Sequence, residues 1–126
     1  MSKRIVVAGC RDFENYDIAR EVILQCIKQF ATDDELVFVS GGCKGADTLG
    51  ERFALEFGYK IERYSAEWEK YGRSAGPMRN KKMAEISDFV ICFWDGKSRG
   101  TKSMIEYSKK YNKNIKIHYI NEEKKL

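Results

Sequence analysis

The feature of this sequence that most constrains its fold is a strict alternation of short strand-like runs with longer stretches of helical periodicity. The β-branched run before Gly9 is typical of a buried strand. The stretch over 17–31 then spaces its apolar residues three and four apart, as an amphipathic helix does. The predicted strands are 3–8, 36–39, 59–64, 88–94 and 114–120, and the predicted helices are 17–31, 46–57, 78–86 and 101–111.

Strands that alternate with helices form mostly parallel sheets through right-handed crossovers. We therefore predict an α/β fold: one Rossmann-like three-layer α/β/α domain over residues 1–120, with a mostly parallel five-stranded sheet. Residues 121–126 are predicted to be a solvated C-terminal tail. The charge-rich third strand is expected at an edge, and Gly58 is expected to end the helix before it.

Residues 65–77 contain Trp68, Tyr71 and the sole proline, Pro77, and show no sustained periodicity. We expect a functional loop there, with Pro77 in the first turn of the next helix. In parallel α/β sheets, ligands bind outside the carboxyl ends of the strands, where the strand order reverses. Glycine-rich segments follow the first, second and fourth predicted strands, so the ligand is expected at that edge.

The composition of the chain limits which partners and cofactors are expected. The net charge of +4 comes from 23 basic and 19 acidic residues, which is too mixed to favour nucleic acid as a partner. The four cysteines show no CxxC pair and a single histidine accompanies them, so we expect buried thiols, no metal and no cofactor. No secretory or membrane-spanning run is evident, and the cytoplasm is the expected location.

The first two strand ends carry groups suited to an anion. Gly9 permits close backbone approach, and Arg11 offers a planar fork of donors, although it could instead pair with Asp12 or Asp17. The second strand runs through a glycine-rich turn into a helix, a geometry that exposes amides to an anion. Its candidate ligand contacts are Ser40, Gly41, Gly42, Lys44 and Asp47. Asp47 could equally cap the helix or accept a ribose hydroxyl.

The fourth strand is the most apolar one and ends in the polar turn DGKSRGT. Thr101 is the predicted N-cap of the following helix, and the amides around Gly100 would face an anion. Asp95, Gly96 and Ser98 are further candidates in the same turn. The residues themselves therefore favour a ligand that contains phosphate.

Four segments together resemble one family over nearly the whole chain: GCRDF, SGGCKGAD, EWEKYGRSAGPMRNKKM and FWDGKSRGTKSMIE. They are similar to the YspA-like (YpsA-related) branch of the SLOG superfamily, which is related to the DNA-processing protein DprA (Smf) and to the Lonely Guy phosphoribohydrolases. The resemblance implies a Rossmann-like domain for nucleotide-derived ligands, a sensor in some relatives and an enzyme that cleaves an N-glycosidic bond in others. It also makes a homodimer reasonable.

By motif matching, the resemblance implies ligand contacts at Gly9, Arg11, Ser40, Gly41, Gly42, Asp47, Gly96, Ser98, Gly100 and Thr101. Arg79 and Asn80 would reach the same pocket from the third predicted helix. Trp68 could stack on a base, or it could cover the core as an aromatic plug.

The Lonely Guy motif PGGxGTxxE carries a glutamate in the first helical turn, and here that turn holds Lys102, Ser103 and Met104. Glu106 is the nearest carboxylate, on another azimuth of the helix. We therefore expect a binding module that senses, carries or sequesters a nucleotide-derived ligand, such as an ADP-ribose or NAD derivative. The alternative is an N-glycosyl hydrolase or transferase acting on nucleoside monophosphates, with Glu106, Asp95 or Asp47 as its carboxylate.

Overall fold

The computed structural model describes residues 2–30 and 35–120. Its elements follow one another in the predicted alternation. They are β1 (Ser2–Gly9), α1 (Tyr16–Phe30), β2 (Glu35–Ser40), α2 (Ala46–Phe57), β3 (Lys60–Arg63), α3 (Trp68–Tyr71), the 3-10 turn η1 (Gly72–Ser74), α4 (Ala75–Ile86), β4 (Phe89–Trp94), α5 (Arg99–Lys110) and β5 (Asn114–Tyr119). The predicted tail over 121–126 and Ala31, the last residue of the first predicted helix, lie outside the described residues.

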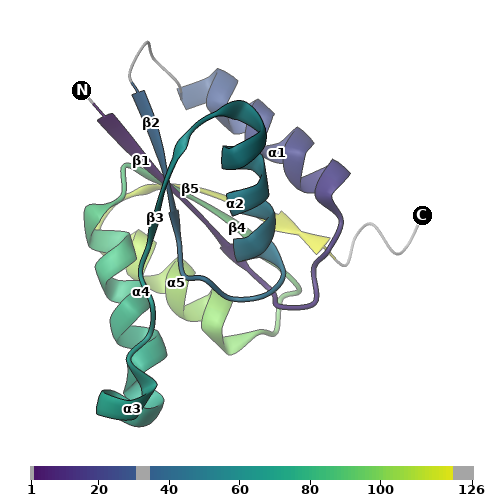
Figure 1. Cartoon of the computed structure of the whole chain (residues 1–126). Coiled ribbons are helices and arrows are strands. Elements are labelled where there is room, and N and C mark those ends of the chain that lie inside the picture. Colours follow the sequence, from purple (N-terminus) through teal and green to yellow (C-terminus); the bar gives the residue numbers. More distant parts are fainter. Residues whose placement is uncertain (1, 31–34, 121–126) are drawn as a thin grey trace.

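The five strands form one sheet in the order β3-β2-β1-β4-β5, and every neighbouring pair is parallel. The chain moves outward from β1 to β3, then returns to the other side of β1 with β4 (Figure 1). The strand order thus reverses between β1 and β4. This is the place where Rossmann-like sheets leave a crevice at the carboxyl ends of their strands.

Helices cover both faces of the sheet, as the alternating sequence predicted (Figure 1). One face packs Ile5, Val7 and Phe38 against α1 and α2, which contribute residues such as Ile23 and Phe53. The opposite face has its own core with α4 and α5, and its members include Val6, Val90, Met83 and Met104. The expected α/β/α fold is therefore confirmed.

The edge strands differ from the central ones in burial. All of Phe89–Phe93 is buried in β4, whereas β3 contains no fully buried residue. The predicted edge position of the third strand is confirmed, and Gly58 ends α2 in the left-handed conformation at φ 75°.

The prediction of a loop over 65–77 is wrong for most of that segment. It contains α3 and η1, and α4 begins at Ala75, three residues before Met78. Local bonds such as Tyr71 N–H to the Glu67 carbonyl close these turns, and the Trp68 ring packs against Gly76 in α4. The sequence did not indicate α3, η1 or the early start of α4, because Gly72, Gly76 and Pro77 interrupt the helical pattern of apolar residues. Pro77 does lie in the first turn of α4.

Within the described residues, no helix is long and apolar enough to cross a membrane, and no group of three or more potential metal-binding side chains gathers. Three of the cysteines, Cys10, Cys26 and Cys92, are buried as expected. Cys43 is the exception and is only half-buried. It lies in the turn after β2, beside the cavity described next.

Candidate functional site

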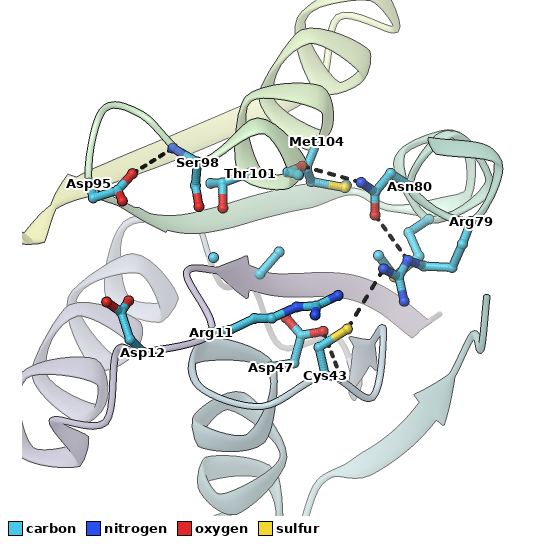
Figure 2. A pocket seen from close by; sticks show the side chains of 14 residues that line it. Arg11, Asp12, Cys43, Asp47, Arg79, Asn80, Asp95, Ser98, Thr101 and Met104 are labelled. Atoms are coloured by element: carbon cyan, nitrogen blue, oxygen red, sulfur yellow. Dashed lines mark hydrogen bonds between the residues drawn. The ribbon is translucent and has the colours of Figure 1, made fainter. Parts of the chain in front are cut away.

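A cavity of about 420 Å³ lies at the carboxyl ends of the central strands, between α4 and the beginning of α5 (Figure 2). Figure 2 shows Arg11 and Asp47 on one side, Ser98 and Thr101 on the opposite side, and Arg79 and Asn80 from α4. A volume of this size is in the range of small-molecule sites, roughly 300–1,000 Å³. The lining consists of Ala8, Gly9, Arg11, Asp12, Cys43, Asp47, Arg79, Asn80, Met83, Asp95, Ser98, Gly100, Thr101 and Met104.

Gly9 allows β1 to leave the sheet beside β4 and the start of α2. A Cβ atom at Gly9 would lie 2.3 Å from the Phe93 carbonyl oxygen and 2.9 Å from the Ala46 Cβ. The next residue, Cys10, donates its N–H to the same Phe93 carbonyl at 3.0 Å, and its own carbonyl accepts the Ala46 N–H at 3.2 Å. Absence of a side chain at Gly9 thus lets β1, β4 and α2 meet at one corner of the cavity.

The first turn of α5 forms another wall of the cavity. Asp95 Oδ1 accepts the N–H groups of Lys97 at 2.8 Å and Ser98 at 2.7 Å, and these backbone bonds lower the pKa of Asp95. Ser98 is the N-cap residue and the helix begins at Arg99, so the prediction of Thr101 as the N-cap is wrong. The Asp95 turn moves the helix start upstream and leaves first-turn amides without intrahelical acceptors at Gly100 and Thr101.

Arg79 and Asn80 approach the cavity from α4. Arg79 Nη1 donates to the Gly41 carbonyl at 2.7 Å, Arg79 Nε donates to Asn80 Oδ1 at 3.0 Å, and Asn80 Nδ2 donates to the Gly100 carbonyl at 3.3 Å. These bonds tie the end of β2 and the start of α5 to α4. The structure shows no ion pair between Arg79 and a described carboxylate, so its positive charge is available to an anion.

Asp47 is a buried carboxyl group in the wall of the cavity, with 6% of its surface exposed. Its Oδ2 accepts the Cys43 N–H at 3.1 Å. Burial raises the pKa of Asp47 to about 6, although the Cys43 bond and the charges of Arg79 and Arg11 oppose the shift. The N-cap of α2 is Gly45, so Asp47 is no cap residue and lies in the first turn.

The cavity gathers nine of the sequence-predicted site residues from four separate segments. They are Gly9, Arg11, Asp47, Arg79, Asn80, Asp95, Ser98, Gly100 and Thr101. The alternative pairing of Arg11 with Asp12 or Asp17 does not occur, since Arg11 forms no ion pair with a carboxylate in the described part of the chain. Arg11 is exposed and extends beside Asp47 (Figure 2).

Other predicted residues lie outside the cavity wall. Ser40 is buried, donates to Glu51 Oε2 at 2.6 Å and accepts the Gly42 N–H at 3.0 Å, so its hydroxyl shapes the turn after β2. Gly41 lies against the Arg79 guanidinium, because a Cβ atom added at Gly41 would be 2.6 Å from Arg79 Nη1. The remaining predicted residues outside the wall are Gly42, Lys44, Trp68, Gly96 and Glu106.

Two of these residues bear on the choice between binding and catalysis. Trp68 is 51% exposed and packs on α4 away from the cavity, so it is neither a plug over the core nor placed to stack on a ligand there. Glu106 is exposed and lies 3.9 Å from Lys102 on the outer side of α5. The structure does not bring Glu106 to the cavity.

The sequence prediction missed several lining residues, including Ala8, Asp12, Cys43, Met83 and Met104. Met83 and Met104 are each 1% exposed and form an apolar part of the wall. Met104 occupies the position of the Lonely Guy glutamate, three residues after Thr101. No local pattern in the sequence distinguishes a buried methionine of the core from one that also borders a cavity.

The fold and the cavity at the strand-order reversal define a Rossmann-like domain with a crevice at the carboxyl ends of its strands. The profile of the YspA, cpYpsA-related SLOG family (YAcAr) matches residues 3–71. The Gene 61 protein of Mycobacterium phage D29 is 35% identical over 114 residues, covering 86% of this chain and 90% of that protein. The chain belongs to the YspA, cpYpsA-related SLOG family, which confirms the resemblance inferred from its motifs.

Two solved structures share the fold. DNA processing protein A (DprA) from Streptococcus pneumoniae superposes with a TM-score of 0.68 at 22% identity, and the match covers 93% of this chain and 50% of DprA. The protein TM1055 gives a TM-score of 0.63 at 20% identity, with 91% of this chain and 72% of that chain covered. This chain therefore corresponds to half of DprA. Membership of the SLOG family suggests a nucleotide-related function.

Proposed function

We propose that the cavity binds a nucleotide or nucleotide-derived ligand that contains phosphate and ribose, and that the protein senses, carries or sequesters this ligand. The observation that carries the proposal is the meeting of the α5 N-terminus with Arg11 and Arg79 around one cavity of about 420 Å³. A helix N-terminus attracts anions through its unpaired amides and its dipole. Arginine adds charge and paired donors that match a phosphate group.

The remaining polar groups suit the ribose. Asp47 and Asn80 are both buried side chains in the cavity wall. A carboxylate accepts hydrogen bonds from sugar hydroxyls, and an amide can donate and accept. In this arrangement the phosphate lies at Gly100 and Thr101, and the sugar lies toward Asp47. Derivatives of ADP-ribose or NAD carry both groups and are within the proposed ligand class.

Binding without turnover is favoured by the apolar wall beside the phosphate position. Met104 lies where a Lonely Guy enzyme has its glutamate, and Glu106 faces outward. A methionine cannot stabilise the positive charge that develops on a sugar during cleavage of the glycosidic bond.

A thermal-shift panel with AMP, ADP, ADP-ribose, NAD and phosphate-free adenosine tests the proposal. At ten times its Kd, a ligand stabilises the folded state by about 1.4 kcal/mol, which corresponds to a rise in Tm of roughly 4 °C. We expect this rise with phosphate-containing ligands and little with adenosine. If none of the nucleotides raises the Tm at millimolar concentration, the proposal is wrong.

A matched pair of charge-removing variants locates the site. Arg11→Gln removes an exposed cation at the cavity, whereas Lys28→Gln removes one in the last turn of α1. Loss of a charge-assisted hydrogen bond of about 1.5–3 kcal/mol weakens binding roughly tenfold or more. We expect that loss by calorimetric titration in Arg11→Gln and unchanged affinity in Lys28→Gln. Equal affinities in the two variants would place the ligand elsewhere.

A second candidate, an N-glycosyl hydrolase or transferase, is favoured by one observation: a buried carboxyl with a pKa of about 6 in the cavity wall, Asp47. Such a group can serve as a general acid near neutral pH. Chromatographic detection of free base released from nucleoside monophosphates tests this candidate. Release that is lost in Asp47→Asn supports it, and absence of release by the wild-type protein rules it out for that panel.

A further inference from the structure

A second cavity, of about 360 Å³, lies beside the first on the side of β3. Its wall is built from the end of β3, the segment that leads to α3, the last residue of α3, and the first two turns of α4. The lining residues are Arg63, Tyr64, Ser65, Glu67, Tyr71, Ala75, Met78, Arg79 and Lys82. Within the predicted loop over 65–77, Trp68 was the one residue expected to contact a ligand, and it does not line this cavity.

Arg79 lines both cavities, so its side chain forms the wall between them. Its guanidinium donates through Nε to Asn80, which lines the first cavity, and through Nη1 to the carbonyls of Gly41 at 2.7 Å and of Tyr64, a residue of the second cavity, at 3.5 Å. Nη2 lies 3.9 Å from the Cys43 sulfur. These acceptors are all uncharged. They fix the position of the guanidinium while its positive charge stays uncompensated by a direct ion pair within the described ranges.

The side chains that line the second cavity suit a planar ligand group such as a base. Tyr71 and Met78 are large apolar side chains that are 38% and 45% exposed, and Ala75 forms a buried floor at 2%. The Lys70 ammonium lies 5.1 Å from the centre of the Tyr71 ring. Arg63 at the rim forms an ion pair with Glu51, 2.6 Å away, whereas Lys82 and Arg79 are cations of this wall without an ion pair among the described residues. Glu67 is the acidic residue of this wall.

We infer that the ligand of this site is a dinucleotide: two nucleoside units joined by a diphosphate that extends from the amides of Gly100 and Thr101 to Arg79, with the second base against Tyr71 and Met78. The inference rests on the proposed function and names its ligand class. Each cavity alone is large enough for one nucleoside unit. A cation fixed between two such cavities suits a bridging diphosphate better than a terminal phosphate, because it can contact both phosphoryl groups.

Calorimetric titration with AMP, ADP and diadenosine diphosphate tests the inference, since the symmetric dinucleotide keeps the base identity constant. A base that stacks on an aromatic side chain gains roughly tenfold or more in affinity. We expect diadenosine diphosphate to bind at least tenfold more tightly than ADP. Tyr71→Ala should abolish that gain and leave the AMP affinity unchanged, while Tyr71→Phe keeps it. Tyr119→Ala, which changes a similarly exposed tyrosine on β5, is the control.

The outcomes separate this inference from the proposed function. Equal affinities for ADP and diadenosine diphosphate, or a dinucleotide preference that survives Tyr71→Ala, overturn the inference and leave the proposed function in place. Loss of AMP binding in Tyr71→Ala also overturns it, because one nucleotide would then span both cavities. If neither AMP nor diadenosine diphosphate binds, the proposed function fails and the inference fails with it. Tm values of the tyrosine variants show whether each one is folded.

Discussion

Asp47 illustrates how a residue in the cavity wall can oppose folding. Its carboxyl is buried, and burial raises its pKa from 3.8 to about 6. The folded protein therefore holds this proton more tightly than the unfolded chain does. The contribution of this group to the free energy of unfolding is fully present below pH 3.8 and is lost as the pH rises through 6. The total loss is about 3 kcal/mol.

We predict that Asp47→Asn is more stable than the wild-type protein at pH 7.5 and equally stable near pH 4. The amide oxygen of asparagine still accepts the Cys43 N–H, whereas no buried charge has to form. Urea denaturation at several pH values measures the difference. Because Glu62 and Asp95 have lowered pKa values and favour folding at higher pH, only the difference between the two proteins isolates Asp47. A constant difference across this range would contradict the assignment.

Gly9 and Gly100 both line the cavity but differ in their surroundings. A Cβ at Gly9 would clash with the Phe93 backbone, whereas nothing lies within 4 Å of a Cβ at Gly100. We predict that Gly9→Ala destabilises the fold by about 3 kcal/mol or more through overpacking. Gly100→Ala, in the first turn of α5, should be neutral or stabilising by about 0.5 kcal/mol. Denaturant midpoints of the two variants check both values, and similar losses would refute the packing argument.

At the scale of elements, the turn between β4 and α5 determines where the first-turn amides of α5 lie. Asp95 accepts two amides in that turn, and Trp94 Nε1 donates to the Ser98 carbonyl at 3.1 Å. The helix therefore begins at Arg99, and its first turn borders the cavity. The position of the phosphate in the proposed site depends on this turn more than on any single lining side chain.

We predict that Asp95→Ala destabilises the protein by about 1–2 kcal/mol, as loss of a helix-capping side chain does. Asp95→Asn should cost less, because its amide oxygen still accepts both N–H groups. Ligand affinity should fall more in the alanine variant than stability alone would explain, since the first-turn amides lose their fixed position. Chemical denaturation and titration with the best nucleotide of the panel measure the two effects. An alanine variant with normal stability and affinity would show that the turn forms without Asp95.

At the scale of the whole molecule, the charge is unevenly divided between the two helical layers. Most basic residues of the α4 and α5 layer are exposed. Between positions 75 and 113 the basic residues are Arg79, Lys81, Lys82, Lys97, Arg99, Lys102, Lys109, Lys110 and Lys113, and the acidic ones are Glu85, Asp88, Asp95 and Glu106. This layer therefore accounts for the net positive charge of +4. Such a face could attract nucleic acid without any specific site.

We predict that single-stranded oligonucleotides bind weakly to this basic face and that a rise in salt removes the binding. Non-specific contacts of this kind typically have Kd values of about 10⁻⁴–10⁻⁶ M at physiological salt. Fluorescence anisotropy between 50 and 200 mM salt measures the dependence. Binding tighter than about 10⁻⁶ M at the higher salt would revive nucleic acid as a partner of this protein.

Some parts of the site were predictable because they follow from local sequence. Gly9, Arg11 and Gly100 stand in the turns that follow predicted strands, and a parallel sheet brings the carboxyl ends of its strands to one edge. Residues of α4 were assigned by the family resemblance alone, because no local pattern indicates that Arg79 turns back toward β2. The role of Ser40 could not be predicted, since its hydroxyl donates to Glu51, which lies on the next element. The position of Glu106 away from the cavity was already indicated by its azimuth on the helix, where it lies one turn after Lys102.

The sequence by itself determined the order of strands and helices, because apolar periodicity and glycine punctuation act over a few residues. It also determined which edge of the sheet carries the polar turns. Only the tertiary structure decided that Asp47 is buried, that Met104 lies in the cavity wall, and that Arg79 separates two cavities. The physical reason is that burial and enclosure depend on contacts between segments far apart in the chain, which no local pattern encodes.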